Sequence, residues 1–178
     1  LEACGIIEEI GSEVNWFKVG DRVAHSSMPI GSYSEKQVFP QEKLVSVPDG
    51  ISNEIAAVIM LKGITAEYLL HRSYPAKKGD KILFHAAAGG VGQILCQWAN
   101  SIGCTVIGTV GSKEKEAIAK KNGCHHVINY TDHNFVEEVE KIVGKNGIDV
   151  VYDGVGASTF EGSIECLKIR GMMVAFGN

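Results

Sequence analysis

The chain contains 178 residues, with 17 Lys and Arg, 21 Asp and Glu, and a formal net charge of −4. This mild negative charge makes nucleic acid and anionic membranes poor partners. Hydrophobic residues form 45% of the chain and charged residues 21%, which is typical of a globular protein and excludes a fibrous or disordered chain. The 21 glycines are about twice the usual share of roughly 7%. They indicate tight turns where backbone approaches a ligand.

The cysteines indicate the redox state of the compartment, and the lengths of the apolar runs bear on membrane insertion. Five cysteines are scattered without a Cys-x-x-Cys pair, so neither a disulfide framework nor a zinc ribbon is supported. We therefore expect a reduced, cytoplasmic protein. The longest apolar run, from Ile55 to Leu61, is far shorter than the roughly 20 residues that cross a bilayer. The strand-like opening without an initiator Met also leads us to expect a fragment of a longer protein.

The first third of the chain predicts a small β-rich domain. Short apolar runs separated by Gly, Pro, Asn and Asp predict strands over Ala3–Ile10, Arg22–Ala24, Tyr33–Phe39 and Leu44–Val47. The period then becomes helical, through Ser52–Met60 and Thr65–Arg72. We therefore predict one domain over residues 1–54 and a second over residues 55–178.

Beyond residue 80, strands and helices alternate. The expected strands are Lys81–His85, Thr105–Val110, Val127–Asn129, Asp149–Tyr152 and Met172–Phe176, and the expected helices are Gly90–Ile102, Lys113–Asn122, Asn134–Val143 and Ser158–Leu167. Short connections of this kind imply a parallel sheet with right-handed crossovers. The sequence therefore predicts a doubly wound α/β (Rossmann) domain whose ligands bind at the carboxyl ends of the strands.

A glycine-rich loop follows the first of these strands. The run Ala87-Ala88-Gly89-Gly90-Val91-Gly92 fits the dinucleotide fingerprint with Ala87 in place of the first glycine. Gly89 would let backbone approach a pyrophosphate, and the N–H groups around Gly90 and Val91 would hold it at a helix N-terminus. A glycine-rich turn in an unrelated α/β protein is the alternative.

The second strand favours NADPH over NADH. An NAD site usually places an acidic residue at the end of this strand, but the chain has Gly111 and Ser112 there, followed by Lys113 and Lys115. A helix start with a hydroxyl and two lysines would stabilise a 2′-phosphate. The alternative is that both lysines are solvated surface residues, and Glu114 between them weakens the local positive field.

Together these motifs resemble the zinc-independent quinone oxidoreductases of the medium-chain dehydrogenase/reductase superfamily. The resemblance covers the full chain and is carried by Leu1-Glu2-Ala3-Cys4-Gly5, Val19-Gly20-Asp21-Arg22-Val23, Leu61-Lys62-Gly63-Ile64-Thr65, Ala86–Gly92, Gly108-Thr109-Val110-Gly111, Val127-Ile128-Asn129-Tyr130, Val150-Val151-Tyr152-Asp153 and Phe176-Gly177-Asn178. It implies most of an NADPH-binding Rossmann domain, preceded by the C-terminal part of a GroES-like substrate domain.

The resemblance also implies roles for individual residues. Lys115 and Tyr130 match residues that hold the 2′-phosphate, although a structural Tyr130 is an alternative. Other matched positions would lie along the nicotinamide and its pocket: Thr65, Tyr68, Val155, Phe176, Gly177 and Asn178. For Val155 and Phe176, plain core packing is the alternative. No catalytic residue is assigned.

The same resemblance argues against a metal. Zinc-dependent members have a ligating His where this chain has Leu1 and a ligating Cys near Leu61, and aliphatic side chains cannot bind zinc. An adventitious site at His125, His126 and His133 is an alternative to surface histidines.

We therefore expect NADPH-dependent reduction of a quinone by hydride or electron transfer, without a metal. The protein would be a homodimer with no nucleic-acid or membrane partner. The alternatives are an NADPH-dependent reductase of α,β-unsaturated carbonyl compounds and a non-enzymatic NADPH-binding protein. The charge of −4 and the lack of a basic stripe weigh against the RNA-binding form of the last class.

Overall fold

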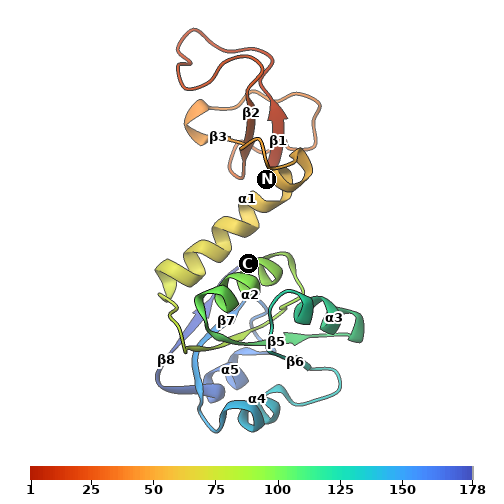
Figure 1. The fold of residues 1–178 in the computed structure, drawn as a ribbon, viewed down its shortest axis with the longest axis vertical. Helices are drawn as coiled ribbons and strands as arrows, with labels where there is room; N and C mark the ends of the chain where they lie inside the picture. The colour runs from red at the N-terminus through yellow and green to blue at the C-terminus, as the bar shows by residue number, and fades with distance from the viewer. Residues whose placement is uncertain (178) are drawn as a thin grey trace. The chain divides into compact units, whose positions relative to one another are not determined.

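A computed structural model describes residues 1–177 (Figure 1). Contacts divide the chain into two compact units, Leu1–Ile64 and the part from Thr65 onward. The division falls within helix α1 (Asn53–Tyr68), whereas the boundary between residues 54 and 55 stays a prediction. Among the described residues, no helix is long and apolar enough to cross a membrane.

The first unit contains a small antiparallel sheet. Strands β1 (Ala3–Ile6), β2 (Arg22–His25) and β3 (Val45–Ser46) pair in the order β1-β2-β3, and a short 3-10 helix, η1 (Gln41–Lys43), precedes β3. Side chains attach this sheet to α1. The Arg22 Nε donates to Asn53 Oδ1 at 3.0 Å. Glu2 accepts the backbone N–H of Leu61 at 2.9 Å and forms an ion pair with Lys62.

The predicted strand over Tyr33–Phe39 is wrong. This segment is a loop held by local hydrogen bonds, in which Ser34 Oγ donates to the carbonyl of Gly31 at 2.6 Å and Gln37 Nε2 donates to that of Pro29 at 3.1 Å. Its alternating pattern does not mark a buried face, because Val38 is 95% exposed. Both edges of the central strand β2 are also already paired. The first strand is also shorter than predicted, because it ends at Ile6.

The two helices predicted between Ser52 and Arg72 form one continuous helix, α1, followed by a π-helical turn, η2 (Leu69–Ser73). The expected break lay near Gly63. A single glycine costs a helix interior only about 1 kcal/mol, and a Cβ at Gly63 would make only an ordinary contact of 3.5 Å with Ile59. The glycine therefore does not end the helix.

The second unit alternates strands and helices as predicted. In chain order it contains β4 (Lys81–Phe84), α2 (Gly90–Ile102), β5 (Thr105–Val110), α3 (Lys113–Lys121), β6 (His126–Asn129), α4 (Phe135–Val143), β7 (Ile148–Asp153), α5 (Phe160–Cys166) and β8 (Leu167–Ala175). All strand pairs are parallel, in the order β6-β5-β4-β7-β8. Helices α2 and α3 cover one face, and α4 and α5 cover the other (Figure 1). The doubly wound α/β fold is thus confirmed.

Both faces of the central strands are buried. In β4, Ile82 and Phe84 belong to the apolar cluster that includes Leu95 of α2, whereas Leu83 belongs to the cluster that includes Val139 of α4. The same alternation holds in β5 and β7. Successive side chains of a strand point to opposite faces, so continuous apolar runs are what a doubly covered parallel sheet requires.

Gly108 in β5 is where the sheet and the glycine-rich loop approach most closely. A Cβ at this position would lie 2.5 Å from Ala87 Cβ and 2.8 Å from Cys124 Sγ. We therefore predict that Gly108→Ala lowers the free energy of unfolding by about 1–3 kcal/mol through overpacking. Urea denaturation measures the change.

Gly63→Ala is the matched control, because the same added methyl meets only the ordinary contact with Ile59. It should stabilise α1 by about 0.5–1 kcal/mol. Equal unfolding free energies for Gly108→Ala and the unchanged protein would contradict the close approach.

Candidate functional site

The five parallel strands of the second unit place their carboxyl ends along one edge of the sheet. These ends are Phe84, Val110, Asn129, Asp153 and Ala175. Most of the predicted site residues lie in the loops that follow these strands or in the first turns of the helices after the loops: Gly89, Gly90, Val91, Gly111, Ser112, Lys115, Tyr130, Val155, Phe176 and Gly177. Ligands of open α/β sheets bind at this edge.

The glycine-rich loop brings backbone close to the start of α2. Gly89 is the N-cap of α2 and has no side chain to cap the helix. No side-chain cap hydrogen bond therefore occupies the N–H groups of the first turn. A Cβ at Gly92 would lie 2.5 Å from the carbonyl oxygen of Ala87 and 2.7 Å from that of Ala86. Only glycine therefore allows the helix to begin so close to β4. The result is a helix N-terminus suited to a phosphate group.

The ends of β5 and β6 meet beside the N-terminus of α3. The Tyr130 hydroxyl lies 2.5 Å from the point where a Cβ of Gly111 would be, so the ring lies close to the Gly111 backbone. Ser112 caps α3 by accepting the Lys115 N–H at 3.4 Å. A hydrogen bond with the Ser112 side chain lowers the pKa of Glu114. Tyr130 is 51% exposed and Lys115 is exposed, so both can reach a ligand.

Val155 and Phe176 follow the ends of β7 and β8. Val155 is 48% exposed, and its N–H donates to Asp153 Oδ1 at 2.8 Å. The Phe176 ring lies 3.1 Å from the Cβ position of Gly154 and packs against the core beside Phe84. Phe176 therefore has a packing role in addition to any ligand contact. Gly177 has a φ of +79°, and Asn178 lies outside the described residues.

The predicted contacts Thr65 and Tyr68 lie three residues apart on α1, which places them on the same face of the helix. Both are half-buried, and Tyr68 packs against the core cluster beneath α2. Their contacts with a cofactor stay predictions.

A buried polar network beneath the carboxyl edge is not found by the sequence analysis. His85 hydrogen-bonds through Nδ1 with Thr109 Oγ1 and through Nε2 with Ser163 Oγ, both at 2.9 Å. Asp153 accepts the Thr159 hydroxyl at 2.7 Å and lies 3.4 Å from Ser163 Oγ. The only sequence signal is the occurrence of polar residues at the ends of apolar strands.

Burial and hydrogen bonding set the charges in this network. Burial lowers the pKa of His85, although the charge of Asp153 opposes this shift. Burial raises the pKa of Asp153, but hydrogen bonds from Gly156, Thr159 and Val155 outweigh it, so that pKa is lowered overall. The network therefore contains a neutral imidazole and an ionised carboxylate at neutral pH.

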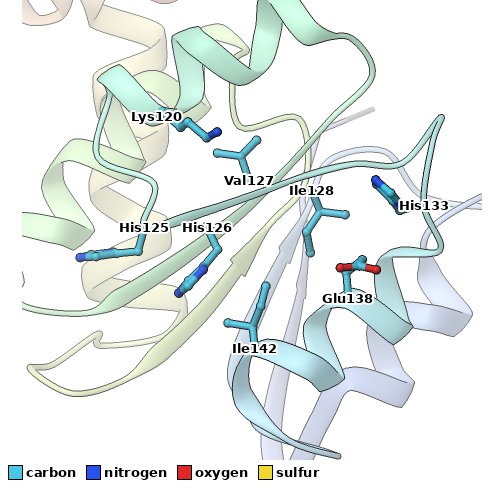
Figure 2. A pocket seen from close by; sticks show the side chains of 8 residues that line it. All are labelled: Lys120, His125, His126, Val127, Ile128, His133, Glu138 and Ile142. Atoms are coloured by element: carbon cyan, nitrogen blue, oxygen red, sulfur yellow. The ribbon is translucent and has the colours of Figure 1, made fainter.

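A pocket of about 350 Å³ lies beside the edge strand β6, lined by Lys120, His125, His126, Val127, Ile128, His133, Glu138 and Ile142 (Figure 2). Figure 2 shows His126 and His133 on opposite sides of Ile128. Over residues 1–177, no three His, Cys, Asp or Glu side chains are grouped to hold a metal ion.

Two family models match parts of the chain, residues 1–75 and residues 90–178. Residues 90–178 match the family described as "Zinc-binding dehydrogenase", and residues 1–75 match "Alcohol dehydrogenase GroES-like domain". The GroES-like part of the predicted fold is thereby confirmed.

Named relatives agree with these matches. The chain is 48% identical over 180 residues to a 2-haloacrylate reductase of Burkholderia sp., and 46% identical over 177 residues to quinone oxidoreductase 1 of Escherichia coli. These alignments cover 100% and 99% of this chain, and 54% of each relative. The chain thus spans about half the length of these relatives.

Solved structures give the same result. The crystal structure of Escherichia coli quinone oxidoreductase complexed with NADPH superimposes with a TM-score of 0.95 at 47% identity, over 99% of this chain and 54% of that one. A quinone oxidoreductase of Pseudomonas syringae superimposes with a TM-score of 0.94 at 48% identity, over 99% and 55%. The predicted resemblance is confirmed, and the chain belongs to the zinc-binding dehydrogenase family.

Proposed function

We propose that the chain is part of an NADPH-dependent oxidoreductase that reduces quinones without a metal ion. The observation that carries this proposal is the likeness, at 47% identity and a TM-score of 0.95, to a quinone oxidoreductase complexed with NADPH. Residues 1–54 would belong to the GroES-like substrate domain and residues 55–178 to the NADPH-binding domain.

The geometry of the carboxyl edge supports NADPH as the cofactor. The first-turn N–H groups of α2, reached through Gly89, Gly90 and Val91, would hold the pyrophosphate. Lys115, Ser112 and the Tyr130 hydroxyl would hold the 2′-phosphate, and Gly111 leaves room for the Tyr130 ring beside them. No carboxylate follows the end of β5 at Gly111 or Ser112 to bind a free ribose 2′-hydroxyl. The residues present therefore fit NADPH better than NADH.

The loops after β7 and β8 support the placement of the nicotinamide at this end of the site. NADPH supplies a hydride when bound, and a quinone accepts it without polarisation by a Lewis acid. The nicotinamide would be bordered by Val155, Phe176 and Gly177, which would exclude water, and Asn178 is next to Gly177 in sequence. Thr65 and Tyr68 would orient the nicotinamide ring from α1. Rate enhancement would then come mainly from proximity and orientation.

The residues do not fit a catalytic zinc ion, despite the name of the family. Leu1 and Leu61 have no side-chain lone pair to offer a metal. The Glu2 carboxylate between them already accepts the Leu61 N–H and pairs with Lys62. Zinc-independence is therefore part of the proposal, and no step is assigned to a metal.

We further propose that the protein is a cytoplasmic homodimer with no nucleic-acid or membrane partner. The five free cysteines support a reducing compartment, and the net charge of −4 argues against polyanions. Strand β8 lies at the edge of the described sheet, which offers a surface for pairing with a second copy.

A second candidate activity is the NADPH-dependent reduction of α,β-unsaturated acids or carbonyl compounds, favoured by the 48% identity to a 2-haloacrylate reductase. Steady-state NADPH oxidation by the full-length protein separates the two activities. We expect faster turnover with a simple quinone than with 2-chloroacrylate. The reverse order would replace the main proposal with the second candidate.

We predict that NADPH binds more tightly than NADH and that Lys115→Ala removes much of the difference. Loss of a charge-assisted hydrogen bond should weaken NADPH binding about tenfold to hundredfold, while Tyr130→Phe should have a smaller effect. Neither variant should change NADH binding, because NADH lacks the 2′-phosphate. Fluorescence titration of the full-length protein gives the dissociation constants.

Lys121→Ala is the matched control, because Lys121 lies at the other end of α3 and loses the same charge. It should leave both cofactor affinities unchanged. Equal affinity for NADPH and NADH, unaffected by Lys115→Ala, would require a site built around NAD instead.

We also predict that the purified full-length protein contains no stoichiometric zinc. Elemental analysis after exhaustive dialysis should find far less than one zinc ion per chain, with turnover unchanged by a chelator. One retained zinc per chain would show that other side chains supply the ligands.

A further inference from the structure

A buried network centred on His85 joins the start of the glycine-rich loop, the end of β5 and helix α5. His85 immediately precedes the glycine-rich loop, Thr109 lies two residues before Gly111, and Ser163 belongs to α5. The imidazole is 1% exposed, and Phe135 packs edge-on against it at a centroid distance of 5.0 Å. The ring is therefore held by direct protein contacts.

The hydrogen-bond partners of His85 and its burial determine which ring nitrogen carries the proton. Ser163 Oγ lies 2.7 Å from the carbonyl oxygen of Thr159 and 3.4 Å from Asp153 Oδ2, and both of these can only accept. The Ser163 proton points to one of these oxygens, so the hydroxyl must accept a proton from His85 Nε2 at 2.9 Å. Burial lowers the pKa of His85, so the ring is neutral at neutral pH, and with its proton on Nε2 it accepts the Thr109 hydroxyl at Nδ1. All donors and acceptors of His85 are satisfied in this one tautomer.

The network continues to the turn that follows β7. The Asp153 carboxylate accepts the N–H groups of Val155 and Gly156 at 2.8 and 3.0 Å, and the Thr159 hydroxyl at 2.7 Å. These bonds fix the backbone that carries Val155. Ser163 lies in the first turn of α5, and its hydroxyl donates to the carbonyl of Thr159, the N-cap residue of that helix. The position of His85 is thereby linked to the position of Val155.

We infer that His85, as a neutral imidazole protonated at Nε2, is a positioning residue that fixes the Val155 turn relative to the glycine-rich loop. This inference rests on the proposed NADPH function. The glycine-rich loop would hold the pyrophosphate, and the Val155 turn would border the nicotinamide. The His85 network would therefore fix the position of the nicotinamide site relative to the pyrophosphate site. Buried hydrogen bonds with satisfied partners rigidify their surroundings. The bond from His85 to Ser163 supports the Val155 turn, so its loss should weaken contacts with the nicotinamide half of the ligand.

Two substitutions test the two hydrogen bonds of the His85 ring one at a time. In His85→Asn, the amide reaches the place of Nδ1 and keeps the bond with Thr109, but it cannot reach Ser163. In His85→Gln, the longer side chain brings an N–H to the place of Nε2 and keeps the bond with Ser163. NADPH and adenosine 2′,5′-bisphosphate, which lacks the nicotinamide half, are then titrated against the full-length variants.

We expect His85→Asn to weaken NADPH binding about tenfold, since it leaves the Ser163 side of the network unpaired. His85→Gln should restore most of this loss. Neither variant should change the affinity for adenosine 2′,5′-bisphosphate. Equal losses for both variants, or no loss in either, would overturn the inference. His85→Met fills about the same space as Gln without a hydrogen bond and should bind NADPH as weakly as His85→Asn. Binding by His85→Met as tight as that by His85→Gln would also overturn the inference, because packing alone would then explain the effect.

A second measurement does not depend on cofactor binding or on a variant that folds. Long-range proton–nitrogen correlation spectra of protein with 15N-labelled histidine report the tautomer of His85. The inference requires a proton on Nε2 and none on Nδ1 at neutral pH, whereas a charged ring or the Nδ1–H tautomer would contradict it. If the unchanged protein fails to bind NADPH while this tautomer is found, the proposed function fails and the hydrogen-bond assignment stands.

Discussion

Helical crossovers join successive strands of the sheet, so the strands run parallel and their carboxyl ends meet at one edge, and the same helices bury both faces of β4, β5 and β7. Each helix that covers the sheet must return the chain to the opposite edge. The loops after the strands are the segments left to contact a ligand, since the strands themselves are enclosed. Packing thus places the glycine-rich loop, the start of α3 and the Val155 turn side by side without any direct pairing between their sequences.

Steric demands then determine the residues at this edge. Gly92 must lack a side chain because the carbonyl oxygens of Ala86 and Ala87 occupy the space, and Gly111 must lack one because Tyr130 lies there. Close packing at Gly92 places the start of α2 beside β4, and close packing at Gly111 places the Tyr130 hydroxyl beside the start of α3, at the two places where phosphates would bind. The His85 network adds a polar support beneath the apolar sheet, with its charge held on Asp153 by hydrogen bonds.

Much of this could be predicted from the sequence. Helix α2 and strand β5 begin and end at the predicted residues, because their apolar periods are long and unambiguous. The predicted strand at Tyr33–Phe39 was wrong because alternation cannot reveal whether a pairing edge is free. The bonds of His85 were missed because Thr109 and Ser163 lie 24 and 78 positions away along the chain. Only the folded sheet brings these polar side chains together.

We propose that NADPH binds at the carboxyl edge of the sheet and not in the pocket beside β6. Hydrogen–deuterium exchange of the full-length protein with and without NADPH distinguishes the two places. We expect slower exchange at residues 86–92, 111–115 and 154–156, with residues 125–128 unchanged. Protection at residues 125–128 without any at the three loops would contradict it.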